Sequence, residues 1–285
     1  MTHLQKVKID CQVKKLLFFG GVYSNIHALK ALKKYAIDQG FGSQQIFSTG
    51  DIAGYCAFPN ECFELIEEWG VAGIKGNVEE NLLDGKDDCG CNFEEGTTCD
   101  VLSKNWFSYT SRMLSEKSKQ YISTLPSILS IDFAGRKIQL IHGSYPETAA
   151  FVFDSTPWSE KQAVFEQFDA DIVVGGHCGL PFISSKDAKA WINPGVIGMP
   201  ANDGEPFVWF MTLTRISEET RASLAVNYHR ISYNYQEAAR AMLDNCLPGA
   251  YAKTILTGLW DNCDILPPEE TSRQGRKIGL THCRI

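Results

Sequence analysis

Short apolar runs recur along the chain, and most of them end in a glycine-containing turn beside a polar residue. Runs of this length, bounded by turns, are typical of buried β-strands. They lie at residues 16–19, 45–48, 71–75, 138–141 and 172–174. The turns that follow four of them are Gly50-Asp51, Gly76-Asn77, His142-Gly143 and Gly176-His177. The pattern predicts parallel or mixed strands whose ends carry polar side chains.

Helical periodicity follows several of these runs. Apolar residues at positions 26, 29, 32 and 36 share one face of a predicted helix, and Asn25 is placed to cap its first turn. A second helix begins near Pro59, because proline fits the first turn of a helix. Strands that alternate with helices in this way are typical of α/β folds.

The second half of the chain is richer in strands. Residues 127–132 and 136–141 flank Ala134-Gly135 and predict a hairpin, and further strands are expected at 189–193, 207–214 and 223–232. Helices are expected from about residue 235. We predict one domain over residues 1–266. Order signals end after Pro267-Pro268, so residues 267–285 are predicted to be a flexible tail.

Composition narrows the class of protein. The chain has 285 residues, 44% hydrophobic and 21% charged, which is typical of a globular protein, and no apolar run is long enough to cross a membrane. The net charge is −7 without long basic runs, which argues against nucleic acid as a partner. Ten cysteines without disulfide-scaffold spacing, and an N-terminus without a secretory signal, predict reduced thiols and a cytoplasmic location.

The polar residues at the strand ends form a candidate metal site. Carboxyl ends of neighbouring parallel strands meet at one edge of a sheet, so these side chains can converge. Asp and Asn after glycine are also ordinary turn residues, and each alone is a weak signal. Together the set of nitrogen and oxygen ligands suits Zn²⁺, Mn²⁺ or Fe²⁺ better than Ca²⁺. The candidate ligands are Asp51, Asn77, His142 and His177.

Five sequence blocks around these residues resemble the calcineurin-like metallophosphoesterase superfamily, over about residues 16–210. STGDIAGYCAFPNECFELI resembles its Gly-Asp block, IKGNVEENL its Gly-Asn-His-Asp/Glu block and LIHGS its late-strand His-Gly. VVGGHCGLPF resembles its Gly-His-Thr-His block, and WINPGVIGMPANDGEPFVWF the strand pair that follows. The resemblance implies a four-layer α/β/β/α sandwich of two mixed β-sheets, with the site at their strand ends.

The resemblance also implies that one of two metal sites is lost. The opening Asp-x-His block of the family aligns with Gly21 and Tyr23, and the last histidine of Gly-His-x-His aligns with Gly179. In the family, these three positions hold the ligands that bind only one of the two metals. The ligands of the other metal are all kept, as Asp51, Asn77, His142 and His177. A single divalent transition metal, Zn, Mn or Fe, is therefore the expected cofactor.

One metal can still polarise a phosphoryl oxygen and activate a bound water beside Asp51, His142 and His177, which are the expected catalytic residues. The family's proton donor aligns with Val78, and loss of a general acid typically costs about 10²–10⁴-fold in rate. Tyr23 or Glu79 could replace it by position, although packing in the vacated site is the simpler role for Tyr23.

Three further groups of residues are candidates for binding. Asn25, Tyr55 and Asn77 are placed by position to contact substrate. Cys89, Cys91 and Cys99 lie in one loop, and Cys178 lies beside His177. Thiolates bind Zn and Fe well, so Cys89, Cys91 and Cys178 are possible extra ligands. The alternative is a glycine-rich surface loop with incidental thiols, because no fourth ligand is evident.

Three functions remain open at this point. The first is a metal-dependent phosphoesterase that hydrolyses a phosphate mono- or diester, with reduced or altered activity and a small phosphorylated substrate or nucleotide as its partner. The second is a catalytically silent regulator that binds phosphate or a nucleotide in the same crevice. The third is a metal or redox sensor that depends on the cysteines.

Overall fold

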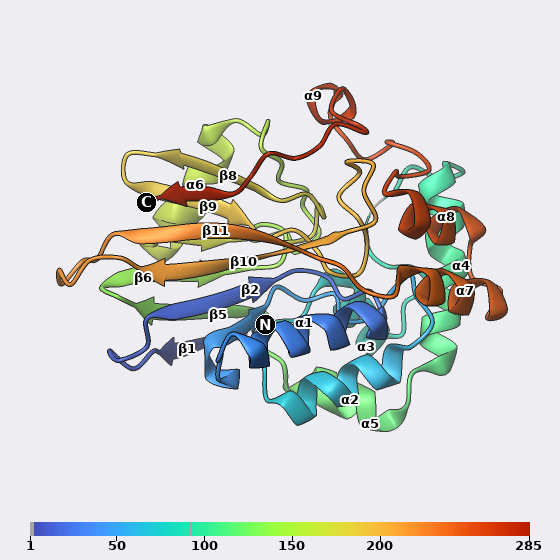
Figure 1. Ribbon diagram of the computed structural model, residues 1–285. Helices are drawn as coiled ribbons and strands as arrows, with labels where there is room; N and C mark the ends of the chain where they lie inside the picture. Colours follow the sequence, from blue (N-terminus) through green and yellow to red (C-terminus); the bar gives the residue numbers. More distant parts are fainter. Residues whose placement is uncertain (1–2, 92) are drawn as a thin grey trace.

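Two mixed sheets of six strands each form the centre of the molecule in the computed structural model, which describes residues 3–91 and 93–285 (Figure 1). The first sheet has the order β1 (Leu4–Lys8), β5 (Ile128–Phe133), β6 (Arg136–Leu140), β7 (Ile172–Val174), β9 (Lys189–Asn193) and β8 (Phe182–Lys186). The second has the order β12 (His282–Arg284), β11 (Leu224–Ile231), β10 (Val208–Arg215), β2 (Lys15–Phe19), β3 (Ile46–Ser48) and β4 (Ala72–Gly73).

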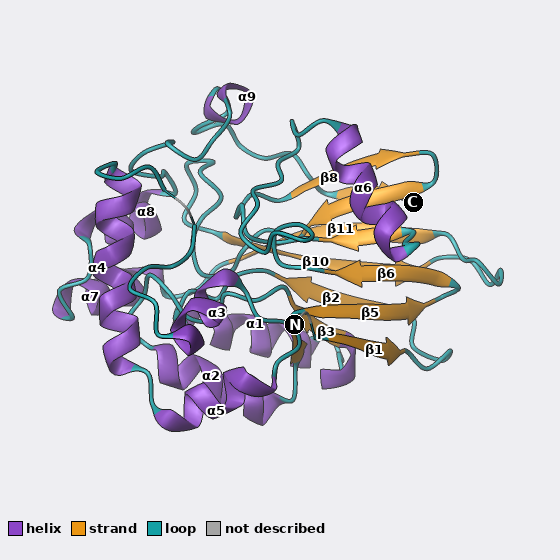
Figure 2. Ribbon diagram, turned by 180° about the vertical axis from the view of Figure 1, so that it is seen from behind, coloured by secondary structure: helices purple, strands orange, loops and turns teal. Residues whose placement is uncertain are grey.

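The helices lie outside the two sheets. They are α1 (Ile26–Asp38), α2 (Pro59–Trp69), α3 (Asn77–Asp84), α4 (Thr98–Met113), α5 (Glu116–Thr124), α6 (Trp158–Phe168), α7 (Tyr235–Asp244), α8 (Gly249–Thr257) and α9 (Pro268–Thr271), with a short 3₁₀ turn at Ser43–Gln45. Helices α4, α7 and α8 gather at one end of the molecule in both views (Figures 1 and 2). Among the described residues, no helix is both long and apolar enough to cross a bilayer.

Alternation along β2 shows how the layers form. Successive side chains of a strand point to opposite faces, so a strand buried on both sides is apolar throughout. Leu16 and Phe18 pack between the two sheets, whereas Leu17 and Phe19 pack against the helical layer that contains α1 and α2. On the other side, α6 lies on the outer face of the first sheet (Figure 2). Its Phe165 belongs to the apolar cluster between this helix and the sheet. The predicted four-layer α/β/β/α sandwich is confirmed.

Parallel pairing brings the loops of the candidate site to the same end of the sheets. In the second sheet β2, β3 and β4 run parallel, and in the first sheet β6, β7 and β9 run parallel. Asp51 follows β3, Asn77 begins α3 just after β4, and His142 and His177 follow β6 and β7. The strand ends predicted from the sequence therefore converge.

The C-terminal segment differs from the flexible tail that the sequence predicts. Residues 267–285 contain α9 and β12, and β12 pairs antiparallel with β11, with Val226 opposite Cys283. The exposed stretch at residues 271–279 misled the prediction, because the partner that holds the last strand is an edge strand more than 50 residues earlier in the chain.

Candidate metal centre

Tight turns place the side chains at the strand ends. Asp51 and His177 both have positive φ angles, of 54° and 58°, in the left-handed region that residues other than glycine seldom adopt. Gly76 lies directly against Asp51, because a Cβ on Gly76 would be 2.0 Å from Asp51 Oδ1. A residue without a side chain is needed there, so that the loop carrying Asn77 can approach Asp51. Strained turns of this kind are found at functional sites.

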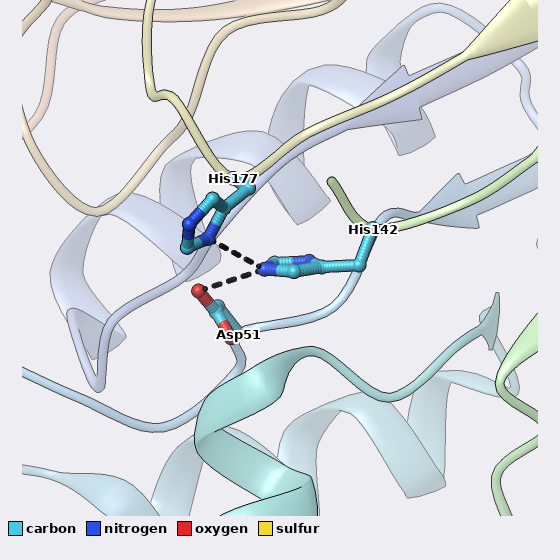
Figure 3. A group of neighbouring side chains, drawn as sticks. All are labelled: Asp51, His142 and His177. Carbon is cyan, nitrogen blue, oxygen red and sulfur yellow. Dashed lines mark hydrogen bonds and ion pairs between the residues drawn. The ribbon is translucent and has the colours of Figure 1, made fainter. Parts of the chain in front are cut away.

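Three polar atoms converge on His142 Nε2, and two of them, from Asp51 and His177, are drawn in Figure 3. It lies 3.2 Å from Asp51 Oδ2, 2.9 Å from Asn77 Oδ1 and 3.1 Å from His177 Nδ1. Asp51, His142 and His177 form a group of ligand atoms that all lie within 4.8 Å of one another. All four side chains are buried, with at most 7% of any one exposed. The structure therefore brings together the whole candidate ligand set predicted from the sequence.

The hydrogen bonds around the cluster leave unprotonated atoms facing one another. His142 Nδ1 lies 2.7 Å from the carbonyl oxygen of Thr49, which can only accept, so Nδ1 carries the proton and Nε2 of the neutral ring presents a lone pair. Asn77 Nδ2 donates to the carbonyl oxygen of Cys89, which turns Oδ1 toward His142. When both imidazoles are neutral, a carboxylate oxygen, an amide oxygen and two imidazole nitrogens face a common point. Such an arrangement suits a cation.

The spacing of these atoms also fits a metal of ordinary size. Tetrahedral coordination with bonds of about 2.0–2.1 Å separates neighbouring ligand atoms by roughly 3.3 Å. The three separations from His142 Nε2 lie between 2.9 and 3.2 Å. Ligand identity, spacing and the fixed orientation of His142 therefore all match a first-row divalent metal.

Electrostatics favours the ligating forms of Asp51 and His177. Burial raises the pKa of Asp51, but the facing His142 and His177 outweigh it and hold that pKa below its usual value. Burial and the neighbouring His142 lower the pKa of His177 to about 3. Burial lowers the pKa of His142, but Asp51 and the Thr49 carbonyl together raise it above its usual value. An ionised Asp51 and a neutral His177 are the states that bind metal.

Glu79 supports the loops of the cluster rather than facing its centre. Its carboxylate accepts hydrogen bonds from the backbone N–H groups of Asp51 (2.8 Å), Ala53 (3.0 Å) and Gly76 (2.8 Å), and the side chain is fully buried. Burial and the charge of Asp51 raise the pKa of Glu79 to about 7, while the backbone donors act in the opposite direction. Because both oxygens are already occupied, the suggestion that Glu79 replaces the proton donor is not supported.

Aromatic rings cover the positions where the family's other metal would have its ligands. The ring of Tyr23 lies against Gly21, and Tyr23 is 6% exposed. The ring of Trp260 lies beside Gly179, with two of its carbon atoms 3.6 and 3.7 Å from the point where a Cβ would be. Burial raises the pKa of Tyr23 well above its usual value, and Asp51 raises it further. Tyr23 therefore packs as a neutral phenol in this part of the site.

The substrate-binding candidates have different surroundings. Asn25 Oδ1 accepts from Ala28 N–H and caps α1, and its Nδ2 donates to Gly198 O and Tyr233 Oη. Its polar atoms are thus engaged within the protein, and the suggestion that Asn25 binds substrate is not supported. Tyr55 does line the pocket above Asp51 and His177. Asn77 belongs to the ligand cluster itself.

The cysteines lie near the cluster but do not join it. In the described residues the metal-binding group contains no thiol. Cys91 Sγ accepts from Asn77 Nδ2 at 3.3 Å, and Cys178 Sγ lies 3.1 Å from Asn193 Nδ2. Burial raises the pKa of Cys178 to about 12 and that of Cys99 to about 11. Cys89, Cys91 and Cys178 thus lie outside the compact group of ligand atoms, and their role as extra ligands stays a prediction.

Three residues near the cluster were not singled out as site residues by the sequence. The Thr49 carbonyl orients His142, and Asn193 holds the loop of His177 by donating to Gly176 O at 2.8 Å. Phe151 covers His177, with ring centroids 4.2 Å apart. Thr49 lies beside the Gly-Asp turn, which is a usable signal, but Phe151 belongs to a loop without any motif.

The fold and the strand-end cluster together define a class of metallophosphoesterase-like proteins. The family model described as the Calcineurin-like phosphoesterase superfamily domain matches residues 20–215. The chain belongs to the calcineurin-like phosphoesterase superfamily, as its sequence blocks predict.

Individual relatives support the same fold. The uncharacterized protein MJ0912 of Methanocaldococcus jannaschii is 26% identical over 255 residues, which cover 83% of this chain and 95% of that protein. The crystal structure of a metallophosphoesterase from Sphaerobacter thermophilus has a TM-score of 0.66 at 22% identity, and covers 87% of this chain and 100% of that one. The hypothetical protein PH1004 of Pyrococcus horikoshii OT3 has a TM-score of 0.69 at 20% identity, with 86% and 99% covered.

Proposed function

We propose that this protein is a metal-dependent phosphoesterase that binds a single divalent metal through Asp51, Asn77, His142 and His177. The observation that carries the proposal is the convergence of four lone-pair atoms, buried at the strand ends of a phosphoesterase fold. Zn²⁺, Mn²⁺ and Fe²⁺ suit this set of nitrogen and oxygen ligands. When bound, such a metal polarises a phosphoryl oxygen and lowers the pKa of a water molecule.

The chain itself contributes positioning. Thr49 fixes the tautomer of His142, Glu79 holds the turns of Asp51 and Gly76 together, and Phe151 covers one face of His177. Rigid placement of reacting groups is a major source of rate enhancement. The loops therefore fix the ligand residues in place, and a substrate phosphate binds at the cluster that these residues form.

The site has no evident proton donor for a leaving group among the residues described above. Val78 stands where a donor is expected, and Glu79 is engaged by backbone groups. Loss of a general acid typically lowers the rate by about 10²–10⁴-fold. We therefore propose that the enzyme acts on esters whose leaving groups need no proton, such as acidic phenols. A regulator that binds phosphate without cleaving it is the second candidate, favoured by the same missing donor.

Metal analysis and turnover test the proposal together. Protein purified under reducing conditions is analysed for metal content and assayed with 4-nitrophenyl esters of phosphate in the presence of Mn²⁺, Zn²⁺ or Fe²⁺. We expect one metal per chain and slow hydrolysis, both lost in His142→Ala and His177→Ala. The exposed His282, which bonds Asn227, provides the matched control His282→Ala.

Each alternative has its own outcome in this experiment. Metal without turnover favours the binding regulator. Two metals per chain contradict the single site. A protein that takes up no metal, or that keeps its metal in both histidine variants, refutes the proposed centre.

A further inference from the structure

The pocket above the metal centre has aromatic walls. Asp51 and His177 lie among the residues that line it, so part of the ligand cluster borders this pocket. Its aromatic members come from widely separated segments of the chain and are Tyr23, Tyr55, Phe93, Phe151, Tyr251 and Trp260. Aromatic side chains bind apolar groups by stacking and edge contacts as well as by excluding water. A ligand seated on the cluster therefore contacts rings.

The rings are held in fixed positions by other parts of the protein. Trp260 Nε1 donates to the carbonyl oxygen of Pro200 at 2.8 Å. Tyr55 stacks on Trp106 with centroids 4.6 Å apart and meets Tyr251 edge-on at 4.9 Å. Preorganised aromatic surfaces lose little entropy when a ligand binds. The aromatic wall is thus a preorganised surface.

The charged side chains described in the lining of this pocket are acidic. Among the described residues that line it there is neither Lys nor Arg, and the acidic ones are Asp51 and Asp261. An adjoining pocket, which shares Cys91 and Phe93 with it, adds three acids and again no Lys or Arg. These acids are Glu94, Glu147 and Asp264. A negative ligand must therefore be neutralised by the metal alone.

The net charge of the metal-loaded centre would be balanced by a ligand with one negative charge. A divalent cation formally keeps one positive charge after Asp51 is counted, since Asn77, His142 and His177 are neutral ligands. A phosphodiester carries one negative charge and is neutralised. A phosphomonoester carries two negative charges near neutral pH, so one of these charges would remain buried beside acidic side chains without a partner. An uncompensated buried charge is strongly unfavourable. Nucleoside polyphosphates and nucleic acids fit still less well.

We propose that the site selects phosphodiesters whose second ester substituent is an apolar, preferably aromatic group, seated against Tyr251 and Trp260. This inference rests on the proposed phosphoesterase function and names its substrate class. The rings of Tyr23 and Trp260 lie where the family's other metal would have its ligands, so the place of a second cation has become an apolar wall. The absence of a second cation disfavours a doubly charged ligand, and the aromatic rings in its place favour an apolar substituent.

Three substrates with the same 4-nitrophenolate leaving group separate charge from aromatic contact. They are 4-nitrophenyl phosphate, methyl 4-nitrophenyl phosphate and bis(4-nitrophenyl) phosphate. We expect KM to be lowest for the bis-aryl diester, at least about fivefold lower than for the methyl diester, as stacking contacts predict. The monoester should have the highest KM.

Two variants test the wall. Trp260→Leu and Tyr251→Leu should each raise KM for bis(4-nitrophenyl) phosphate several-fold and leave KM for the methyl diester within about twofold. Trp69→Leu, on α2 and outside both pockets, is the matched control. Equal effects on both diesters, or no effect in either variant, overturn the aromatic seat. A monoester KM equal to or below that of the diesters overturns the charge argument while the phosphoesterase function stands.

Binding measurements with non-hydrolysed esters test the proposed ligand class even if the protein shows no catalysis. If the metal-loaded protein hydrolyses none of the three esters, the proposed function fails, and diphenyl phosphate and phenyl phosphate are then compared by calorimetry. Tighter binding of diphenyl phosphate, weakened in Trp260→Leu or Tyr251→Leu, supports the proposed ligand class. Equal or tighter binding of phenyl phosphate refutes it.

Discussion

The ring of Tyr23 occupies the space that any side chain at residue 21 would need. A Cβ placed on Gly21 would lie 2.4 Å from Tyr23 Cε1 and 2.5 Å from Tyr23 Cζ. These two positions align with the opening metal ligands of the family, so their replacements are physically linked. An acid cannot return at residue 21 while the tyrosine ring is present. In this chain, packing therefore fills the place of two ligands that the sequence resemblance assigns to the family's other metal.

This linkage predicts a large interaction between two substitutions. Gly21→Ala alone should lower the free energy of unfolding by about 1–3 kcal/mol, the usual effect of overpacking. In a Tyr23→Ala background the same change should be nearly neutral, because the clashing ring is gone. Denaturant titrations of the four proteins give the coupling by a double-mutant cycle. Gly279→Ala, with no atom within 4 Å of its Cβ, is the control. Simple additivity would contradict the linkage.

Glu79 should matter for both stability and metal affinity. Glu79→Gln keeps the shape of the side chain but turns an amide N–H₂ toward backbone donors, so at least one buried N–H loses its acceptor. We expect a loss of about 1–3 kcal/mol in the free energy of unfolding. Because the turns of Asp51 and Gly76 loosen, metal affinity should fall about tenfold or more.

Competition with a chelator measures that affinity, and the neighbouring Glu80→Gln is the control. Glu80 is partly exposed and its side chain forms no hydrogen bond or ion pair in the described part of the chain. The positioning role of Glu79 is wrong if both variants behave alike.

Local patterns predicted much of this fold from the sequence. The strands predicted at 172–174 and 189–193 coincide with β7 and β9, because almost all of their side chains are buried and each segment ends in a turn. Asn25 caps α1 as predicted, since capping depends only on residues within one turn. The four strand-end residues converge because parallel pairing places strand ends together.

Features that depend on distant partners were not predictable in the same way. Glu79 accepts from Gly76 N–H within the first turn of α3, but its bonds from the N–H groups of Asp51 and Ala53 come from a turn 26–28 residues earlier, which no sequence pattern around residue 79 contains. The strand β1 reads LQKVK and is largely exposed, so it lacks an apolar run, and its partner β5 lies more than 100 residues later. The last strand has the same difficulty, as its partner lies on β11.

The shifted pKa of His177 predicts acid sensitivity of the metal-free protein. An unfolded histidine titrates near pH 6.5, whereas the pKa of His177 in the fold is about 3. Between these values the unfolded chain binds a proton at residue 177 that the folded chain does not. Stability from this residue is therefore complete above about pH 6.5 and is lost as the pH falls, by at most about 1.4 kcal/mol per pH unit.

His177→Gln isolates this contribution. The difference in unfolding free energy between wild type and His177→Gln should shrink as the pH falls from 7.5 to 4.5, when both are measured without metal in urea. A difference that stays constant over this range would show that His177 titrates normally in the fold.

Removal of the last strand should expose one edge of β11 and leave the rest of the second sheet intact. The Leu224 amide donates to Ile285 O and the Tyr228 amide donates to Thr281 O, at 3.0 and 3.1 Å. Truncation after Leu280 removes both acceptors, so these amides should lose hydrogen-exchange protection. The Trp209 amide on β10, which donates to Val196 O at 3.1 Å, should keep its protection. If the amides of Leu224 and Tyr228 stay protected in the truncated chain, β12 does not cover this edge. That result would favour the flexible tail predicted from the sequence.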